Sequence, residues 1–266
     1  MAGLLRTVAE RLHVLEPARA MAAAGRHARH RLVWAARRGF GRHDSALVER
    51  YLAAHAERRL YLGAGRHEID GWLNSDRYPP SPTSLHLDAT QRFPLPDDSF
   101  RYVLSNHMIE HLPYASGAFM LGECLRVLEP GGTLRVSTPD FAFLVEIYRQ
   151  PDTPIVARYL DYHLEWINRD DPATAPVRDA LFVVNNFVRD WGHQFIYDRR
   201  ILRHALEDAG FANIVECALN DSEHAPLRNV SHDERAPAGL VDIETITFEA
   251  TKPLAGQGRT EPGQPQ

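Results

Sequence analysis

Three positions early in the chain combine residue types that suit a nucleoside ligand. The glycine turn Gly63-Ala64-Gly65 follows an expected strand at 59–62, and glycine lets a ligand approach the backbone closely. Asp76 ends the next expected strand, where a carboxylate can accept hydrogen bonds from both hydroxyls of a ribose. Asp88 ends the third and can accept one from the exocyclic amine of adenine. Each residue alone is usually a loop or capping residue, but the combination specifies a nucleoside.

Further polar residues follow the fourth and fifth expected strands. They are Ser105, Asn106 and His107 after one strand and the run 137–140 after the other. Ligands of open α/β sheets bind beyond the carboxyl ends of the strands, where the strand order switches. A histidine or carboxylate within ~3 Å of a hydroxyl can remove its proton. The candidates for this role are His107 first, then His111, His193 and Asp140; the alternative is that they only structure loops.

The elements that must position these residues alternate between strand and helix. Short apolar runs predict strands at 59–62, 72–76, 85–88, 100–106 and 133–137, and later at 213–219 and 244–251. Helices are predicted at 115–128, which Pro130-Gly131-Gly132 ends, and at 198–209, which Gly210 ends. This order predicts an α/β fold, a doubly wound and mainly parallel seven-stranded sheet. Residues 141–190 interrupt the alternation as a mostly helical insert.

Four stretches carry the more distinctive motifs. They are LYLGAGRHEIDGWLNSD at 60–76, FPLPDDSFRYVLSNHMIEHL at 93–112, LRVLEPGGTLRVSTPD at 125–140 and WGHQFIYDRRILRHALEDAGF at 191–211. In these stretches the chain resembles the class I S-adenosylmethionine-dependent methyltransferases. Within that family it is most similar to a bacterial, methyltransferase type 11-like group with a shortened GAG first motif. The resemblance covers most of residues 58–251.

The resemblance implies a Rossmann-like methyltransferase fold with S-adenosyl-L-methionine as cofactor. Residues of the motifs would then each bind one part of the cofactor. Gly63, Ala64 and Gly65 would bind its methionine part, and Asp76 would bind the ribose. Asp88 with Ala89 would bind the adenine, and Ser105, Asn106 and His107 would lie near the reacting methyl group. Two positions depart from the family. Tyr61 stands where many members have an acidic residue, and His67 stands where a third glycine is frequent. Asp140 is a candidate to replace the missing polar contact to the methionine end.

Two other enzyme classes compete for the same residues. The run 107–111 (HMIEH) matches the H-x-x-E-H motif of zinc peptidases, with His107 and His111 as ligands and Glu110 as base. Because His107 directly follows a strand and Pro113 comes soon after, no long helix can hold the pair, and we expect no metal. A nicotinamide dehydrogenase would share the ribose-binding acid, but Glu68 stands where the third glycine of G-x-G-x-x-G belongs.

Composition sets the limits of these interpretations. The chain has 266 residues, a net charge of -5 and two cysteines. The acidic balance argues against a nucleic-acid binder, and two cysteines do not form a disulfide framework. No apolar run approaches the ~18 residues that span a bilayer, and no signal-type core is seen. We therefore expect a cytoplasmic protein, although an acid-poor, Arg-rich N-terminus also resembles organellar transit peptides.

The predicted organisation has three parts. Residues 1–45 form a basic helical extension, with an amphipathic helix at 3–16 and a second helix to about Arg38. Residues 46–254 form the methyltransferase domain, and 255–266 form a disordered tail. The arginines of the extension could contact a membrane surface or an acidic partner, or be a solvated face. The sequence indicates no oligomeric state.

The function predicted from these features is methyl transfer (EC 2.1.1.-) to a small-molecule or glycan acceptor, through a hydroxyl. Aromatic residues of the insert could form a wall for a sugar or ring, or simply the core of the insert: Tyr148, Tyr159, Tyr162, His163 and Trp166. The alternative is a catalytically silent binding or scaffold protein that keeps the fold and uses its basic N-terminal helices for partners.

Overall fold

The computed structural model describes residues 41–170, 177–231, 237 and 239–254. The chain forms two compact units, Met1–Leu47 and Val48–Gln266, and the sheet lies in the second. The helices expected at 3–16 and up to Arg38, and the tail expected at 255–266, lie outside the described residues. No helix in the described ranges is both long and apolar enough to cross a membrane.

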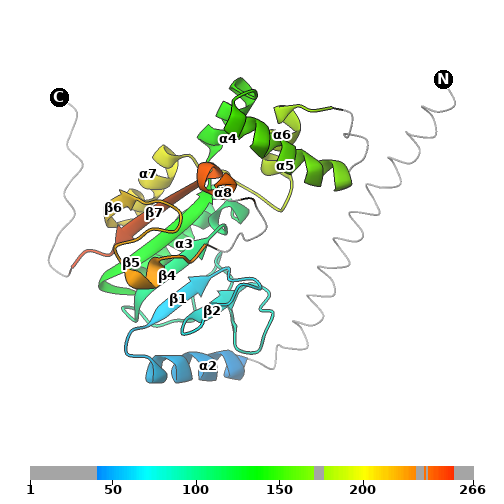
Figure 1. Cartoon of the computed structure of the whole chain (residues 1–266). Helices are drawn as coiled ribbons and strands as arrows, with labels where there is room; N and C mark the ends of the chain where they lie inside the picture. The colour runs from blue at the N-terminus through cyan, green and yellow to red at the C-terminus, as the bar shows by residue number, and fades with distance from the viewer. Residues whose placement is uncertain (1–40, 171–176, 232–236, 238, 255–266) are drawn as a thin grey trace, which may run out of the picture. The chain divides into compact units, whose positions relative to one another are not determined.

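The second unit is built on a seven-stranded sheet of order β3-β2-β1-β4-β5-β7-β6 (Figure 1). Its strands are β1 (Arg59–Leu62), β2 (Leu73–Asp76), β3 (Leu85–His86), β4 (Phe100–Asn106), β5 (Leu128–Pro139), β6 (Ala212–Glu216) and β7 (Thr245–Thr251). Pairings among β1 to β5 are parallel, whereas β7 runs antiparallel to both β5 and β6. The predicted α/β, Rossmann-like sheet of seven strands is confirmed, and it is mixed.

The predicted strands lie close to the observed ones, with three differences. β6 ends at Glu216, three residues before the predicted end at 219. β3 has only two residues, so Asp88 follows the strand rather than ending it. β5 begins at Leu128, earlier than expected, and includes Pro130-Gly131-Gly132, which were predicted to separate helix from strand. Gly131 adopts a left-handed φ of 80° there, a conformation that favours glycine.

Two helices pack side by side against one face of the sheet. They are α3 (Tyr114–Val127) and α7 (Arg199–Ala209), near the predicted ranges, with Met120, Leu121 and Cys124 of α3 fully buried. Asp198 caps the start of α7 by accepting from the Ile201 amide at 2.7 Å. Gly210 ends it with a left-handed φ of 99°.

The connections between the first four strands contain no helix, although residues 63–99 are all described. The run 77–84 carries prolines at 79, 80 and 82, and the run 87–99 carries them at 94 and 96, so neither can sustain a helix. The helices that usually connect such strands are therefore absent from residues 63–99. The second face of this half of the sheet is instead packed by Leu227 and Val230, from the segment 217–231, against Tyr61, Tyr102 and Leu104.

A buried arginine fixes this segment to the sheet. Arg135 of β5 is fully buried and pairs with Glu249 of β7 at 2.5 Å. Its guanidinium also donates to three carbonyl oxygens of the segment 217–231, those of Ala218 at 2.9 Å, Leu219 at 2.7 Å and Asp221 at 2.8 Å. Arg135 therefore neutralises the buried Glu249 carboxylate and holds the segment 217–231 against the second face of the sheet.

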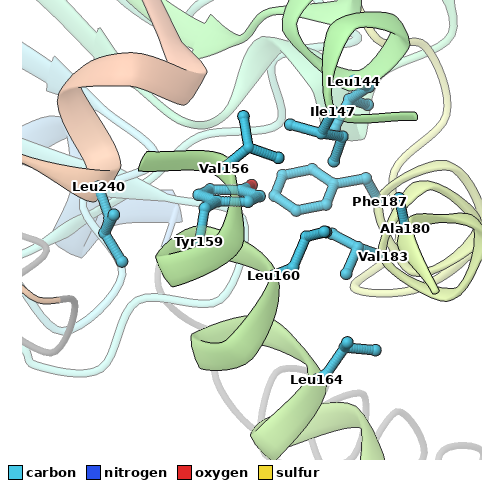
Figure 2. Close-up of a cluster of buried hydrophobic side chains, with 10 residues drawn as sticks. All are labelled: Leu144, Ile147, Val156, Tyr159, Leu160, Leu164, Ala180, Val183, Phe187 and Leu240. Carbon is cyan, nitrogen blue, oxygen red and sulfur yellow. The ribbon is translucent and has the colours of Figure 1, made fainter. Parts of the chain in front are cut away.

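The described residues of the insert, 141–170 and 177–190, form three helices that lie together beyond one end of the sheet (Figure 1). They are α4 (Phe141–Arg149), α5 (Pro154–Asp170) and α6 (Ala180–Arg189). Figure 2 shows their shared core, which Leu240 of α8 (Leu240–Glu244) joins. Tyr159 is fully buried in this core and its hydroxyl donates to Glu244, so it packs the insert rather than lining a site.

The C-terminal carbonyls of α3 are capped from outside the helix. The Lys252 ammonium donates to the carbonyls of Arg126 at 3.2 Å and Leu128 at 2.7 Å, and it pairs with Asp98. The Asp98 amide also donates to the Arg126 carbonyl, at 3.0 Å. The only lysine of the chain therefore satisfies carbonyls that a helix end leaves without an internal partner.

Lys252→Met is expected to lower the free energy of unfolding by about 1–2 kcal/mol, because methionine keeps the apolar stem but loses the charged donor. Urea denaturation of both proteins measures the difference. The control is Arg200→Met, which removes an exposed charge on α7 and should change stability by less than about 0.5 kcal/mol. Equal losses in the two variants would contradict a capping role.

Candidate functional site

The carboxyl ends of β1 and β2 meet at the glycine turn. Gly63 and Gly65 both take left-handed φ values, 68° and 54°, which explains the two glycines. The Gly65 amide donates to Asp76 Oδ2 at 3.1 Å, and the Tyr78 amide donates to Asp76 Oδ1 at 2.6 Å. Each carboxylate oxygen can accept a second hydrogen bond. Asp76 therefore fixes the turn and can still take a ligand.

The two glycines differ in what lies above them. A Cβ at Gly63 would overlap the Met108 side chain, so Met108 packs directly on this glycine. At Gly65, by contrast, no described atom lies within 4 Å of the point where a Cβ would be. The backbone is therefore open to a ligand at Gly65, next to Asp76, and covered at Gly63.

Asp88 lies beside Asp76, because the Leu87 amide donates to the Asp76 carbonyl at 3.0 Å. One of its oxygens accepts from the Thr90 amide at 3.0 Å and from the Thr90 hydroxyl at 2.7 Å, and Arg77 lies 3.5 Å from the other. Burial alone would raise the pKa of Asp88, but these hydrogen bonds outweigh it and hold the pKa below its ordinary value. The following Ala89 is buried.

Tyr61, which replaces the acidic residue of the family pattern, lies on the sheet face that Leu227 and Val230 pack. Burial raises its pKa to about 12, against a hydrogen bond with Asn106 that lowers it, and the nearby Asp76 charge raises it further. The phenol is therefore neutral at ordinary pH, and its hydrogen-bond partner Asn106 stands at the end of β4.

The end of β4 is held by its neighbours. Asn106 Nδ2 donates to the Val230 carbonyl at 2.9 Å, and its amide oxygen accepts from Ser137 at the end of β5. The Ser105 hydroxyl is fully buried and has no hydrogen-bond partner among the described residues. An unsatisfied hydroxyl at a strand end is a hydrogen-bonding group that a bound ligand can use.

His107 lies at the junction of three elements. Its backbone takes a left-handed φ of 43°, unusual for a residue with a side chain, and its amide donates to the Ser137 carbonyl at 3.0 Å. Nδ1 lies 3.4 Å from Glu110 Oε1, and Nε2 lies 3.2 Å from the Thr245 hydroxyl at the start of β7. The side chain is about one-third exposed, at 32%. A half-open imidazole backed by a buried carboxylate is suited to proton transfer.

Glu110 is the buried acid of this region and lies in the 3-10 helix η2 (Ile109–His111). The Thr138 hydroxyl donates to its Oε2 at 3.0 Å. Burial raises the pKa of this carboxyl, but the imidazoles of His107 and His111 outweigh burial and lower it. Because η2 has only three residues, His107 and His111 do not lie on one long helix, as the two histidines of a zinc peptidase do.

The remaining histidine candidates come together with Glu110. The rings of His111 and His193 lie 4.9 Å apart, and His193 follows the turn Trp191-Gly192, in which both residues take left-handed φ values. Burial lowers the pKa of His193. Trp191 is more than half exposed beside it, with ring centroids 5.7 Å apart.

Asp140 has a structural explanation. It caps the start of α4 by accepting from the Ala142 amide at 2.9 Å, and it forms an ion pair with Arg199 of α7. Burial raises its pKa, although both contacts lower it. Because both contacts occupy the Asp140 carboxylate, the geometry does not support the roles predicted for it, as a contact to the methionine end or as a base.

Three contributors to the site were absent from the sequence prediction. The Thr245 hydroxyl lies at hydrogen-bond distance from His107, and the Met108 side chain packs on Gly63. The Val230 carbonyl accepts a hydrogen bond from Asn106. Only Thr245 had a usable signal, because the first residue of an antiparallel last strand lies at the carboxyl edge of the parallel strands.

Comparison with known proteins gives one match in sequence. The model of a family described as a methyltransferase domain matches residues 70–136. This range includes Asp76, Asp88 and the end of β4, and excludes the glycine turn. The match supports a methyltransferase with S-adenosylmethionine as cofactor, and it names no acceptor. No curated protein matches the chain in sequence.

Several solved structures resemble the fold. A SAM-dependent methyltransferase from Thermotoga maritima is 18% identical, with a TM-score of 0.43, over 84% of this chain and 97% of that one. A SAM-dependent methyltransferase from Archaeoglobus fulgidus is 16% identical, with a TM-score of 0.43, and the match covers 84% of this chain and 94% of that one. Phosphoethanolamine N-methyltransferase 2 from Haemonchus contortus, solved with S-adenosyl-L-methionine, is 13% identical, with a TM-score of 0.40. That match covers 80% of this chain and 53% of the other.

Proposed function

We propose that this protein transfers a methyl group from S-adenosylmethionine to a hydroxyl of a small-molecule or glycan acceptor. The observation that carries the proposal is the hydrogen bond from the Gly65 amide to Asp76, at 3.1 Å, beside a backbone that is open at Gly65. It joins the predicted glycine turn and the predicted ribose acid in one place. The methyltransferase-domain match over 70–136 supports the same assignment.

We assign each part of the cofactor to the residues at one strand end. Asp76 would hold the ribose and Asp88 with Ala89 the adenine, while Ser105, Asn106 and His107 would lie near the methyl group. The Ser105 hydroxyl, buried and without a described partner, is suited to a contact with the bound cofactor. When bound, the cofactor supplies an electrophilic methyl group and leaves as S-adenosylhomocysteine.

His107 is the residue proposed to take the proton of the acceptor hydroxyl. If Nδ1 carries its proton toward Glu110, Nε2 keeps the lone pair that a base needs. His107 Nε2, which now lies 3.2 Å from the Thr245 hydroxyl, would exchange that contact for the acceptor hydroxyl and take its proton. The acceptor oxygen would then bond to the methyl carbon as the bond from that carbon to the cofactor's sulfur breaks. Glu110 keeps the ring oriented and stabilises the charge that it gains, as the acid does in a Ser-His-Asp triad.

Asp76→Ala is expected to weaken S-adenosylhomocysteine binding by at least ~100-fold, or about 2.7 kcal/mol, because it removes both the ribose acceptor and the anchor of the Gly65 turn. Calorimetric titration measures both proteins. Asp70→Ala, in the same connection between β1 and β2, is the matched control and should bind within ~3-fold of wild type.

The proposal fails in two ways that this titration separates. A wild-type protein that binds neither S-adenosylmethionine nor S-adenosylhomocysteine at millimolar concentration is not a methyltransferase of this kind. Normal binding by Asp76→Ala would instead show that the ribose lies elsewhere.

A further inference from the structure

Glu110, His111 and His193 form a cluster that no step of the proposed methyl transfer uses in full. Their nearest side-chain nitrogen and oxygen atoms all lie within 4.8 Å of one another. Glu110 is buried, His193 is partly buried and His111 is exposed, so the cluster opens to the surface on one side. Three potential ligands at one place raise the question of whether they bind a metal ion.

The backbone already brings the three residues together. The Glu110 carbonyl accepts from the amides of Gln194 at 2.7 Å and Phe195 at 3.1 Å, which ties the chain after His193 to η2. Gly192 takes a left-handed φ of 83°, and a Cβ placed on it would lie 3.7 Å from His111 Nδ1. The cluster is therefore held by the fold and does not depend on long, mobile side chains.

His193 is fixed in the tautomer that a metal ligand needs. Its Nδ1 lies 2.6 Å from the Phe187 carbonyl oxygen, and because a carbonyl only accepts, Nδ1 must carry the proton. In the neutral ring the lone pair is then on Nε2. Histidines that bind metals show this arrangement, in which the second ring nitrogen donates to a carbonyl or carboxylate.

Glu110 supplies an oxygen that needs a partner. Its side chain is 1% exposed and Oε2 accepts from Thr138, but Oε1 has no hydrogen-bond donor within the described parts of the chain. His107 Nδ1 lies 3.4 Å away, a long contact that orients the imidazole and still leaves this oxygen able to bind a second, cationic partner. A buried carboxylate oxygen is costly unless a cation or donor meets it.

We propose that Glu110 Oε1, His111 and His193 Nε2 bind one divalent transition-metal cation such as Zn²⁺. Two imidazoles and one carboxylate suit Zn²⁺, Fe²⁺ or Co²⁺, whereas Mg²⁺ and Ca²⁺ prefer sites made of oxygen alone. Metal–ligand bonds of about 2 Å require the three atoms to lie about 3 Å apart. The exposed His111 ring can supply this closure by rotating. Three protein ligands leave at least one position open for a further oxygen.

The use of that open position rests on the proposed function. A cation there polarises an oxygen of the acceptor and makes its hydroxyl more acidic, next to His107. Trp191, 53% exposed beside His193, offers a ring face on which a sugar or other cyclic acceptor can pack. The acceptor class that follows is a cyclic compound bearing a hydroxyl.

The test measures metal binding directly and needs no acceptor. Tag-free full-length protein is stripped with a chelator and titrated calorimetrically with Zn²⁺, Co²⁺ and Mg²⁺, and the visible absorption of the Co²⁺ form is recorded. We expect one equivalent of Zn²⁺ or Co²⁺, and a loss of affinity of at least ~100-fold in His111→Ala and His193→Ala. Glu110→Gln, which keeps the side-chain size, should also weaken binding. His204→Ala, an exposed histidine of α7, is the control and should bind as wild type does.

The inference is overturned if the wild type binds Zn²⁺ and Co²⁺ only above ~1 mM, or if it binds Mg²⁺ alone. Unchanged binding by His111→Ala overturns it too, and since that ring is exposed, the variant should fold normally. S-adenosylhomocysteine titration of the same samples separates the two proposals. Cofactor binding without metal binding refutes only the metal site, and metal binding without cofactor binding refutes only the proposed function.

Discussion

His107→Ala is expected to lower kcat by about 10²–10⁴-fold, the usual contribution of a positioned general base, while S-adenosylhomocysteine binds within ~3-fold of wild type. The physical reason is the placement of the imidazole, between the buried Glu110 carboxylate and the Thr245 hydroxyl. Removing it takes away the base but leaves Asp76 and the glycine turn in place. The loss should therefore fall on turnover and spare the cofactor.

The measurement is transfer of a tritiated methyl group. The acceptor is chosen by screening monosaccharides, glycosides and phenols with wild-type protein, and kcat and KM are then compared. His204→Ala serves as the control variant. Because His107 is outside the three proposed metal ligands, His107→Ala should still bind Zn²⁺, whereas His193→Ala should not. A variant that keeps more than about half of wild-type kcat would exclude His107 as the base.

The sequence predicted the strand ends well because the information there is local. A short apolar run marks each strand, and a polar residue with a turn marks its end. Asp76 and the run 105–107 are therefore at the edge where they were expected. The glycine turn was also local, since two left-handed φ values require glycine at both positions. These features need no knowledge of what lies across the sheet.

Predictions were weaker where a long-range contact decides the role of a residue. Asp140 was predicted as a candidate base or as a contact to the methionine end, and nothing in the sequence indicated its ion pair with Arg199, 59 residues later. Tyr159 suited a ligand-binding wall as well as it suited a core, and its hydroxyl bond to Glu244 decides for the core. The prolines at 79, 80 and 82 did carry the missing information about the absent helix, because they exclude a helix from sequence alone.

Arg135 is the clearest case of a role that the sequence hides. In the strand pattern TLRVS it looks like a residue on a solvated face, yet it is fully buried. Its partners come from β7 and from the segment 217–231, more than 80 residues later in the chain. Nothing in the local pattern distinguishes a buried arginine with four acceptors from an exposed one.

Arg135→Met is expected to destabilise the protein by about 3–5 kcal/mol, because it leaves the Glu249 charge buried without its partner. The carbonyls of Ala218, Leu219 and Asp221 also lose the guanidinium donor. Chemical denaturation measures the total loss. Hydrogen exchange and limited proteolysis should show the segment 217–231 opening first, since these three bonds fix it to the sheet.

A double variant separates the two causes. Arg135→Met with Glu249→Leu removes the unpaired charge as well, so it should recover part of the stability that the single change loses, as apolar replacements of buried ion pairs often do. It cannot restore the donors to the three carbonyls, so the segment 217–231 should stay more open than in wild type. Because the Val230 carbonyl of that segment holds Asn106, we also expect both variants to bind S-adenosylhomocysteine more weakly. Full recovery of stability together with wild-type protection of the segment would show that Arg135 acts only as the partner of Glu249.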